Sequence, residues 1–157
     1  TSDRVYLISA VYEGHSIQNT IASTIRKADV VATNATLGGE SAYKVDFVPV
    51  NALPREALIV VVLPATLSLA DPSAPKVVCT GLKNLKGPLT CVYDSSFHNV
   101  TIHSGLERNQ IAPADTRIEI DGFRNPDAAK FTQSFQILTH DSDMFLIDKI
   151  TDGLSFT

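Results

Sequence analysis

The sequence contains no tryptophan, two cysteines and a single methionine among its 157 residues. Without tryptophan it cannot build the Cys–Trp–Cys core of antibody domains, so any immunoglobulin likeness must lie in the architecture alone. Long apolar runs are missing as well. The longest, residues 57–63, has seven residues, whereas a helix that crosses a bilayer needs roughly 20. We therefore expect no membrane span in this segment.

The sequence also lacks a basic surface. Its 13 Lys and Arg residues are outnumbered by 17 Asp and Glu residues, which gives a net charge of −4, and the two signs are interspersed. Because binding to a phosphate backbone requires clustered positive charge, nucleic acid is not an expected partner. The apolar fraction of 44% against a charged fraction of 19% is typical of a chain that folds.

Motifs of catalytic sites are absent too. There is no G-x-S-x-G elbow to present a nucleophilic serine, and Gly38-Gly39 is followed by Glu40 rather than by the lysine of a phosphate-binding loop. His98 and His103 lie five residues apart, so on a single strand they point to opposite faces. The sequence therefore predicts no enzyme, no catalytic residue, no cofactor and no histidine metal site.

Short segments with a period of two dominate the chain. Residues 42–48 alternate Tyr43, Val45 and Phe47 with polar side chains, and residues 98–103 and 116–121 alternate in the same way. A strand with one face in the core produces this pattern. The unbroken apolar run at 57–63 predicts instead a central strand covered on both faces, or a strand that contacts another chain.

Glycine and proline separate these segments at close intervals. Only residues 19–28 are compatible with a short helix, and their threonine and isoleucine content fits a strand equally well, so we expect a strand or irregular structure there. Many short strands with such turns predict an all-β chain. The expected fold is an immunoglobulin-like antiparallel β-sandwich, with a β-barrel as the alternative.

The two cysteines, Cys79 and Cys91, flank a Gly-bounded segment at residues 81–88. A hairpin across that segment would bring the sulfurs within disulfide range; the alternative is a pair of buried free thiols. The N-x-S/T sequons at Asn34 and Asn99 independently indicate an oxidising, secretory compartment. We predict a disulfide, glycosylation of both asparagines, and an extracellular or cell-surface location.

An internal similarity suggests a repeat. Residues 5–19 resemble residues 134–148 once a one-residue gap is allowed, so that Ile8 aligns with Ile137. Two strands joined by a polar turn would also produce such a likeness. If the repeat is real, residues 1–27 are the closing strands of a preceding repeat, and otherwise they are an N-terminal strand segment. Residues 28–157 are expected to form the sandwich, with a repeat length of about 130 residues.

Several segments follow one another in an order that resembles a known repeat. They are residues 41–47, Asn51-Ala-Leu-Pro54, residues 57–64, the cysteine pair, and residues 99–103, 118–126 and 134–141. This order resembles the tandem immunoglobulin-like repeat of large secreted or cell-surface filament and coat proteins of unicellular eukaryotes. The likeness covers residues 28–150, and Phe123 departs from it because the family usually has a smaller aliphatic residue there.

The resemblance implies a non-catalytic structural repeat of an extracellular filament, stalk or surface coat. Such a repeat is joined end to end through strand or inter-domain contacts, so the implied partners are neighbouring copies of the same protein or adjacent repeats. The resemblance identifies no ligand.

Two other functions stay open. An adhesin-type binding module would recognise a glycan or a surface protein through loops at one end of the sandwich; Tyr12, Tyr93 and Phe97 are its candidate contacts, although core packing explains them as well. A calcium-dependent linker would use the carboxylates near one turn. The candidate ligands are Asp141, Asp143 and Asp148, for which an acidic solvent-facing turn is the simpler interpretation.

Overall fold

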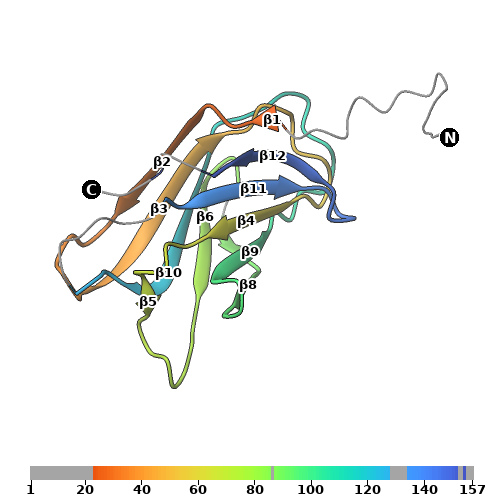
Figure 1. Ribbon diagram of the computed structural model, residues 1–157. Helices are drawn as coiled ribbons and strands as arrows, with labels where there is room; N and C mark the ends of the chain where they lie inside the picture. The colour runs from red at the N-terminus through yellow and green to blue at the C-terminus, as the bar shows by residue number, and fades with distance from the viewer. Residues whose placement is uncertain (1–22, 86, 128–133, 152–153, 155–157) are drawn as a thin grey trace, which may run out of the picture.

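The computed structural model describes residues 23–85, 87–127, 134–151 and 154. Within these residues the chain is all-β, and its strands form two sheets that face each other across one core (Figure 1). The sheets do not close into a barrel. The predicted immunoglobulin-like antiparallel β-sandwich is therefore confirmed, and the barrel alternative is wrong. No helix in the described part of the chain is long and apolar enough to cross a membrane.

The first sheet, sheet A, has the strand order β1-β12-β11-β4-β9-β8. All its neighbours are antiparallel except β1 and β12, which run parallel. In chain order its strands are β1 (Ser23–Thr24), β4 (Leu58–Val62), β8 (Cys91–Asp94), β9 (Asn99–His103), β11 (Gln136–His140) and β12 (Leu146–Ile150).

The second sheet, sheet B, has the order β2-β3-β10-β6-β7, and β5 pairs with one end of β10. Its strand pairs are antiparallel. In chain order its strands are β2 (Lys27–Ala32), β3 (Glu40–Val48), β5 (Ser68–Leu69), β6 (Val78–Lys83), β7 (Gly87–Leu89) and β10 (Thr116–Arg124).

The alternating segments supply the core as predicted. On β3, β9 and β10 every second side chain is buried against the opposite sheet, and β4 contributes in the same way. These buried side chains include Tyr43, Val45, Phe47, Ile59, Val61, Val100, Ile102, Ile118 and Ile120. Burial of this apolar area, at about 25 cal/mol per Å², is the main stabilising term.

The apolar run does form a central strand, because β4 lies between β11 and β9. Its core side is fully buried at Ile59 and Val61. On its other side Val60 is also buried, at 7% exposed, whereas Leu58 and Val62 are half-buried. Within the described residues, β4 is thus fully covered on its core face and partly covered on the other.

The first described strand begins at Ser23. Within the predicted strand-or-irregular segment 19–28, residues 23–24 form β1, and Lys27 begins β2. Ile25 is buried in the core of this sandwich, which therefore includes strand β1 ahead of the predicted boundary at residue 28. Residues 1–22, with the repeat predicted for them, lie outside the described residues.

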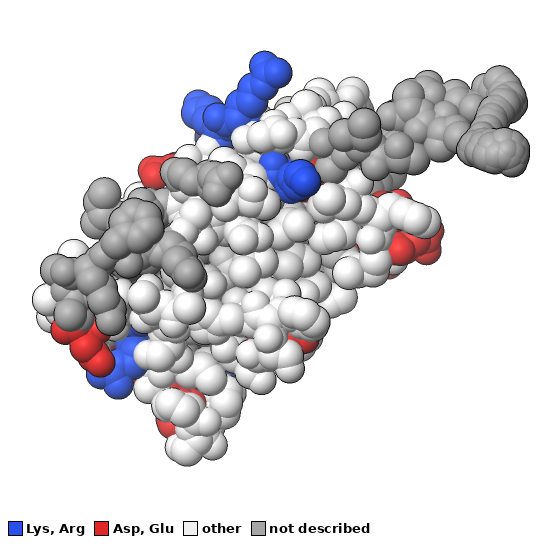
Figure 2. Space-filling model, in the orientation of Figure 1, with Lys and Arg blue, Asp and Glu red and all other residues white. Residues whose placement is uncertain are grey.

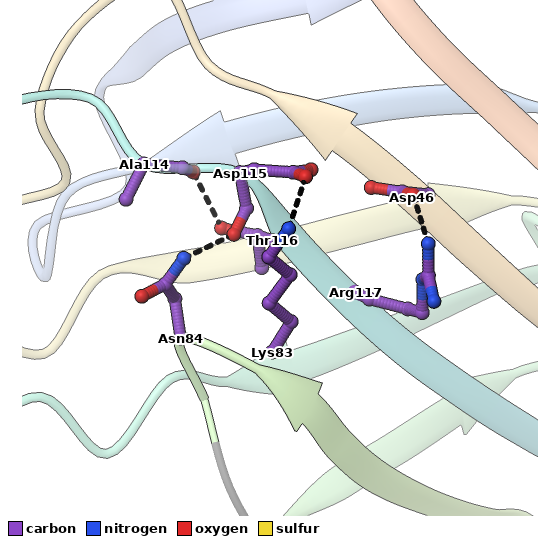
Figure 3. A network of polar contacts seen from close by, with 7 residues as sticks. All are labelled: Asp46, Lys83, Asn84, Ala114, Asp115, Thr116 and Arg117. Atoms are coloured by element: carbon purple, nitrogen blue, oxygen red, sulfur yellow. Dashed lines mark hydrogen bonds and ion pairs between the residues drawn. The ribbon is translucent and has the colours of Figure 1, made fainter.

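The outer face of sheet B carries two ion pairs (Figure 3). Arg117 on β10 donates to Asp46 on β3 over 2.7 Å, and Lys83 at the end of β6 pairs with Asp115 over 2.8 Å. Asn84 donates to the backbone carbonyl of Asp115. Because these groups are solvated, the pairs contribute little to stability; they show that this face is adapted to water.

Gly122 creates a bulge in β10. Its φ of 122° is one that side chains rarely adopt, and a Cβ built there would lie 2.4 Å from the carbonyl oxygen of Lys76. The register against β3 shifts between Ile120 and Phe123. A strict period of two would leave Phe123 on the outer face, whereas the extra residue of the bulge places it in the core. The large Phe123 side chain is accommodated there.

Gly122→Ala should lower the free energy of unfolding by more than about 2 kcal/mol, because it adds both backbone strain and a clash with Lys76. Gly105→Ala is the matched control. Its φ is 69°, but nothing lies within 4 Å of the added Cβ, so it should cost only about 1 kcal/mol. Urea unfolding of the two variants measures the difference, and equal losses would contradict this account of the bulge.

Candidate functional site

The predicted disulfide is present between Cys79 and Cys91, with their Cα atoms 6.2 Å apart. Its setting differs from the expected simple hairpin. Cys79 lies on β6, which pairs with β7 in sheet B, and Cys91 begins β8 in sheet A. The chain crosses between the sheets at Thr90, so the bond joins the two layers of the sandwich. Such bonds persist in oxidising compartments.

A groove of ≈ 670 Å³ lies between the loop before β6 and strand β8, which forms one edge of sheet A. Its lining is mixed, with apolar side chains, the amino group of Lys76 and the hydroxyls of Tyr93 and Ser95. The complete lining is Leu69, Pro72, Pro75, Lys76, Val77, Cys91, Tyr93 and Ser95. A groove of mixed polarity beside an open strand edge is suited to contact with an extended chain.

Tyr93 and His98 hold the β8–β9 hairpin against the core. The Nε2 atom of His98 lies 3.1 Å from the carbonyl oxygen of Pro64 and must donate to it, so Nδ1 accepts from the Tyr93 hydroxyl at 2.7 Å. Both rings pack edge-on against Phe123. Burial, with a smaller effect of the Asp94 charge, raises the pKa of Tyr93. His98 thus has a packing role.

The aromatic residues predicted as binding contacts do not form one cluster. Tyr93 is half-buried in the packing just described, whereas Phe97, at the tip of the same hairpin, is 71% exposed. Tyr12 lies outside the described residues. His103 is exposed on the outer face of sheet A, opposite in direction to His98, as the five-residue spacing predicted.

The sequon at Asn34 lies in an exposed loop between β2 and β3. The Asn34 side chain accepts from the Thr36 amide and donates to the Glu40 carbonyl, both at 3.0 Å. Below the loop, the buried Asn125 donates to the carbonyls of Asn34 and Thr36 and accepts from the Tyr43 hydroxyl at 2.5 Å. Burial raises the pKa of Tyr43 to about 12. The second sequon residue, Asn99, begins β9.

The three candidate calcium ligands are not brought together. One carboxylate oxygen of Asp141 accepts from the amides of Asp143 and Phe145, both at 2.9 Å, and so closes the β11–β12 turn. Asp148 is fully buried and is used elsewhere. The described part of the chain contains no group of three His, Cys, Asp or Glu residues that could hold a metal ion.

Asp148 is the centre of a hydrogen-bond network with Asn51 and Ser23, here called the Asp148 lock, which the sequence did not predict. Its two carboxylate oxygens accept from the backbone and side-chain amides of Asn51, at 3.1 and 2.8 Å. Asn51 also donates to the hydroxyl of Ser23, at 3.2 Å, on β1. The Asn51-Ala-Leu-Pro54 motif therefore fastens the loop after β3 to the first and last described strands. The motif itself was visible in the sequence, but its partner 97 residues away was not.

Comparison with known proteins provides no family assignment. The chain matches none of the protein-family models against which it was scanned, and no curated protein is significantly similar to it. The function must therefore be argued from the sandwich, the disulfide and the contacts of the terminal strands.

Replacing both cysteines, as Cys79→Ala with Cys91→Ala, should lower the free energy of unfolding by about 2–4 kcal/mol, because the bond no longer restricts the unfolded chain. Urea denaturation of the oxidised protein and of the double variant measures the loss. A variant as stable as the oxidised protein would show that the bond between the sheets is dispensable.

His140 should make stability depend on pH. Burial lowers the pKa of His140 below its ordinary value of 6.5, and its Nδ1 atom is buried without a partner in the described part of the chain. The unfolded state therefore takes up a proton first as pH falls, so stability decreases below about pH 6.5. His140→Gln should remove this part of the pH dependence in urea titrations, whereas His103→Gln, at an exposed position, should leave it unchanged.

Proposed function

We propose that this chain is a structural module of an extracellular or cell-surface protein, joined end to end with neighbouring copies or adjacent repeats in a filament, stalk or coat. The observation that carries the proposal is the parallel pairing of the first and last described strands, β1 and β12. The resemblance to tandem repeats points the same way.

The parallel pair resists tension between the chain ends. The chain enters β1 at Ser23 and leaves β12 at Ile150, and these strands run in the same direction. Pulling the two ends apart therefore slides one strand along the other. The bonds between them, including the one from the Ile25 amide to the Lys149 carbonyl at 2.8 Å, are then loaded together rather than one after another. A module that transmits tension benefits from this arrangement.

The lock around Asp148 reinforces the pair. Because Asn51 binds Asp148 on β12 and Ser23 on β1, the two strands are tied to a third part of the sandwich. Hydrogen bonds to a buried charge are among the stronger ones, at about 1.5–3 kcal/mol. On the C-terminal side, the carbonyl of Leu154 accepts from the Phe135 amide at 2.7 Å, so the chain remains attached beyond β12.

The extracellular location is supported by the disulfide and by the two sequons. A bond between the sheets is stable where thiols are oxidised, and both Asn34 and Asn99 lie at the surface. A protein of a reducing compartment needs neither a disulfide nor glycosylation sequons.

An adhesin-type binding module is the second candidate function. The groove beside β8 and the exposed ring of Phe97 favour it. A glycan or an extended segment of a surface protein is the expected ligand class, and a glycan array or a peptide array tests it directly. Binding that Tyr93→Ala abolishes would favour this function over the structural one.

Single-molecule stretching tests the structural proposal, with the whole chain placed between marker domains. Asp148→Ala should lower the unfolding force clearly, because unfolding under force follows the rate of the step that separates β1 from β12. Tyr43→Phe is the matched control, since it removes a buried hydrogen bond of sheet B to Asn125. It should destabilise the protein in urea by about 1 kcal/mol with little change in force. Equal losses of force in both variants would argue against the proposal.

A further inference from the structure

The outer faces of the two sheets differ in character. Sheet B carries the ion pairs of Figure 3, although Val31, Val78 and Leu82 are also exposed on it. The outer face of sheet A around β4 is apolar, with Leu58, Val62 and Leu138 of β11 half-buried around the buried Val60. Figure 2 shows that the surface over β11, β4 and β9 is without acidic or basic side chains. Val92 on the edge strand β8 adds to this face and is 58% exposed. Exposed apolar patches often mark a site of contact with another molecule or group.

Asn99 lies within this face. On β9 it pairs with Val62 on one side and Asp94 on the other. Because Val100 and Ile102 are fully buried, Asn99 points away from the core. Its side-chain amide has no hydrogen bond within the described part of the chain.

The remaining parts of a glycan site are arranged around Asn99. Thr101, whose hydroxyl completes the sequon, lies two residues further on the same face, between Val60 and Val92. Phe97 lies two residues earlier, at the hairpin turn, with its ring 71% exposed. A flat apolar ring at this position can pack against the C–H face of the first sugar of a glycan. The inward hydrogen bonds of His98 keep the turn between them in place.

We infer that Asn99 carries an N-linked glycan, whose first N-acetylglucosamine packs on Phe97 and whose further sugars cover the apolar outer face of sheet A. The inference rests on the extracellular location in the proposed function. In the transfer, Nδ2 of Asn99 forms a bond to C1 of an oligosaccharide carried on a polyprenyl diphosphate. The C1–O bond breaks, the lipid diphosphate leaves, and Nδ2 loses one proton to a base.

A glycan suits this face better than a second protein surface does. A flat protein partner would bury the unpaired amide of Asn99, which costs free energy unless a partner is supplied. The glycan uses that same nitrogen, and its sugars present both C–H faces and hydroxyls. The face is thereby shielded while the molecule stays soluble.

The sequon at Asn34 provides the internal control. The Asn34 side chain is hydrogen-bonded within its own loop, and this loop belongs to sheet B, away from the apolar face. A sugar attached there lies on sheet B and cannot cover the apolar face of sheet A. Occupancy of Asn34 alone should leave the properties of sheet A unchanged.

The test begins with the whole chain secreted from animal cells and digested for peptide mass mapping. Asn99 should be occupied. Asn99→Gln should increase the fluorescence of a hydrophobic dye and promote self-association in sedimentation, whereas Asn34→Gln and Thr101→Ser, which keeps the sequon, should do neither. Adding Val62→Thr to Asn99→Gln should lower the dye signal again, because it makes the face beside Asn99 more polar.

A double-mutant comparison tests the contact with Phe97. Phe97→Ala should lower the melting temperature of the glycosylated protein by about 2–4 °C, and of the Asn99→Gln protein by less than about 1 °C. A purely structural role of Phe97 would give the same shift in both.

Three results would overturn the inference. They are an empty Asn99 in the secreted protein, dye binding that is unchanged in Asn99→Gln, and equal effects of Phe97→Ala in the two backgrounds. None of these affects the unfolding force, so the structural proposal would stand. Failure of the chain to be secreted would contradict the extracellular location and this inference together.

Discussion

The structure depends on the burial of alternate side chains between two sheets. Each long strand contributes every second residue to one apolar layer, and the opposite residues remain on an outer face. This constraint determines where polar chemistry is possible: at strand edges, at turns and on the two outer faces. It also explains why Gly122 is needed. Residue 123 would lie on the outer face in a strict alternation, and the bulge at Gly122 turns Phe123 into the core.

The polar contacts inside the sandwich mostly serve to connect segments that are distant in sequence. Asn51 reaches Asp148, Tyr43 reaches Asn125, and His98 joins Tyr93 to the Pro64 carbonyl. In each of these contacts the buried polar groups are paired, as is usual where water is excluded. These contacts stabilise particular loops and strand ends. A mechanical and surface function is consistent with such a distribution.

The functional parts proposed for this molecule are the terminal strands and the outer face of sheet A, not an internal cavity. In the proposed function, tension along the chain is borne by β1, β12 and the contacts of Asp148, while the disulfide joins β6 and β8 across the layers. The proposed glycan lies on the outer face of the same sheet A, over β4, β9 and β8.

The sequence by itself determined the all-β class, because alternation at residues 42–48, 98–103 and 116–121 is a local property of each strand. It also predicted the bond between Cys79 and Cys91. Only the tertiary structure decided which sheet each strand joins, so the bond between layers, the two-residue strand β1 and the separation of Asp148 from Asp141 were not predictable. The physical reason is that periodicity specifies which face of a strand is buried, whereas its neighbours are selected by contacts between residues far apart in the chain.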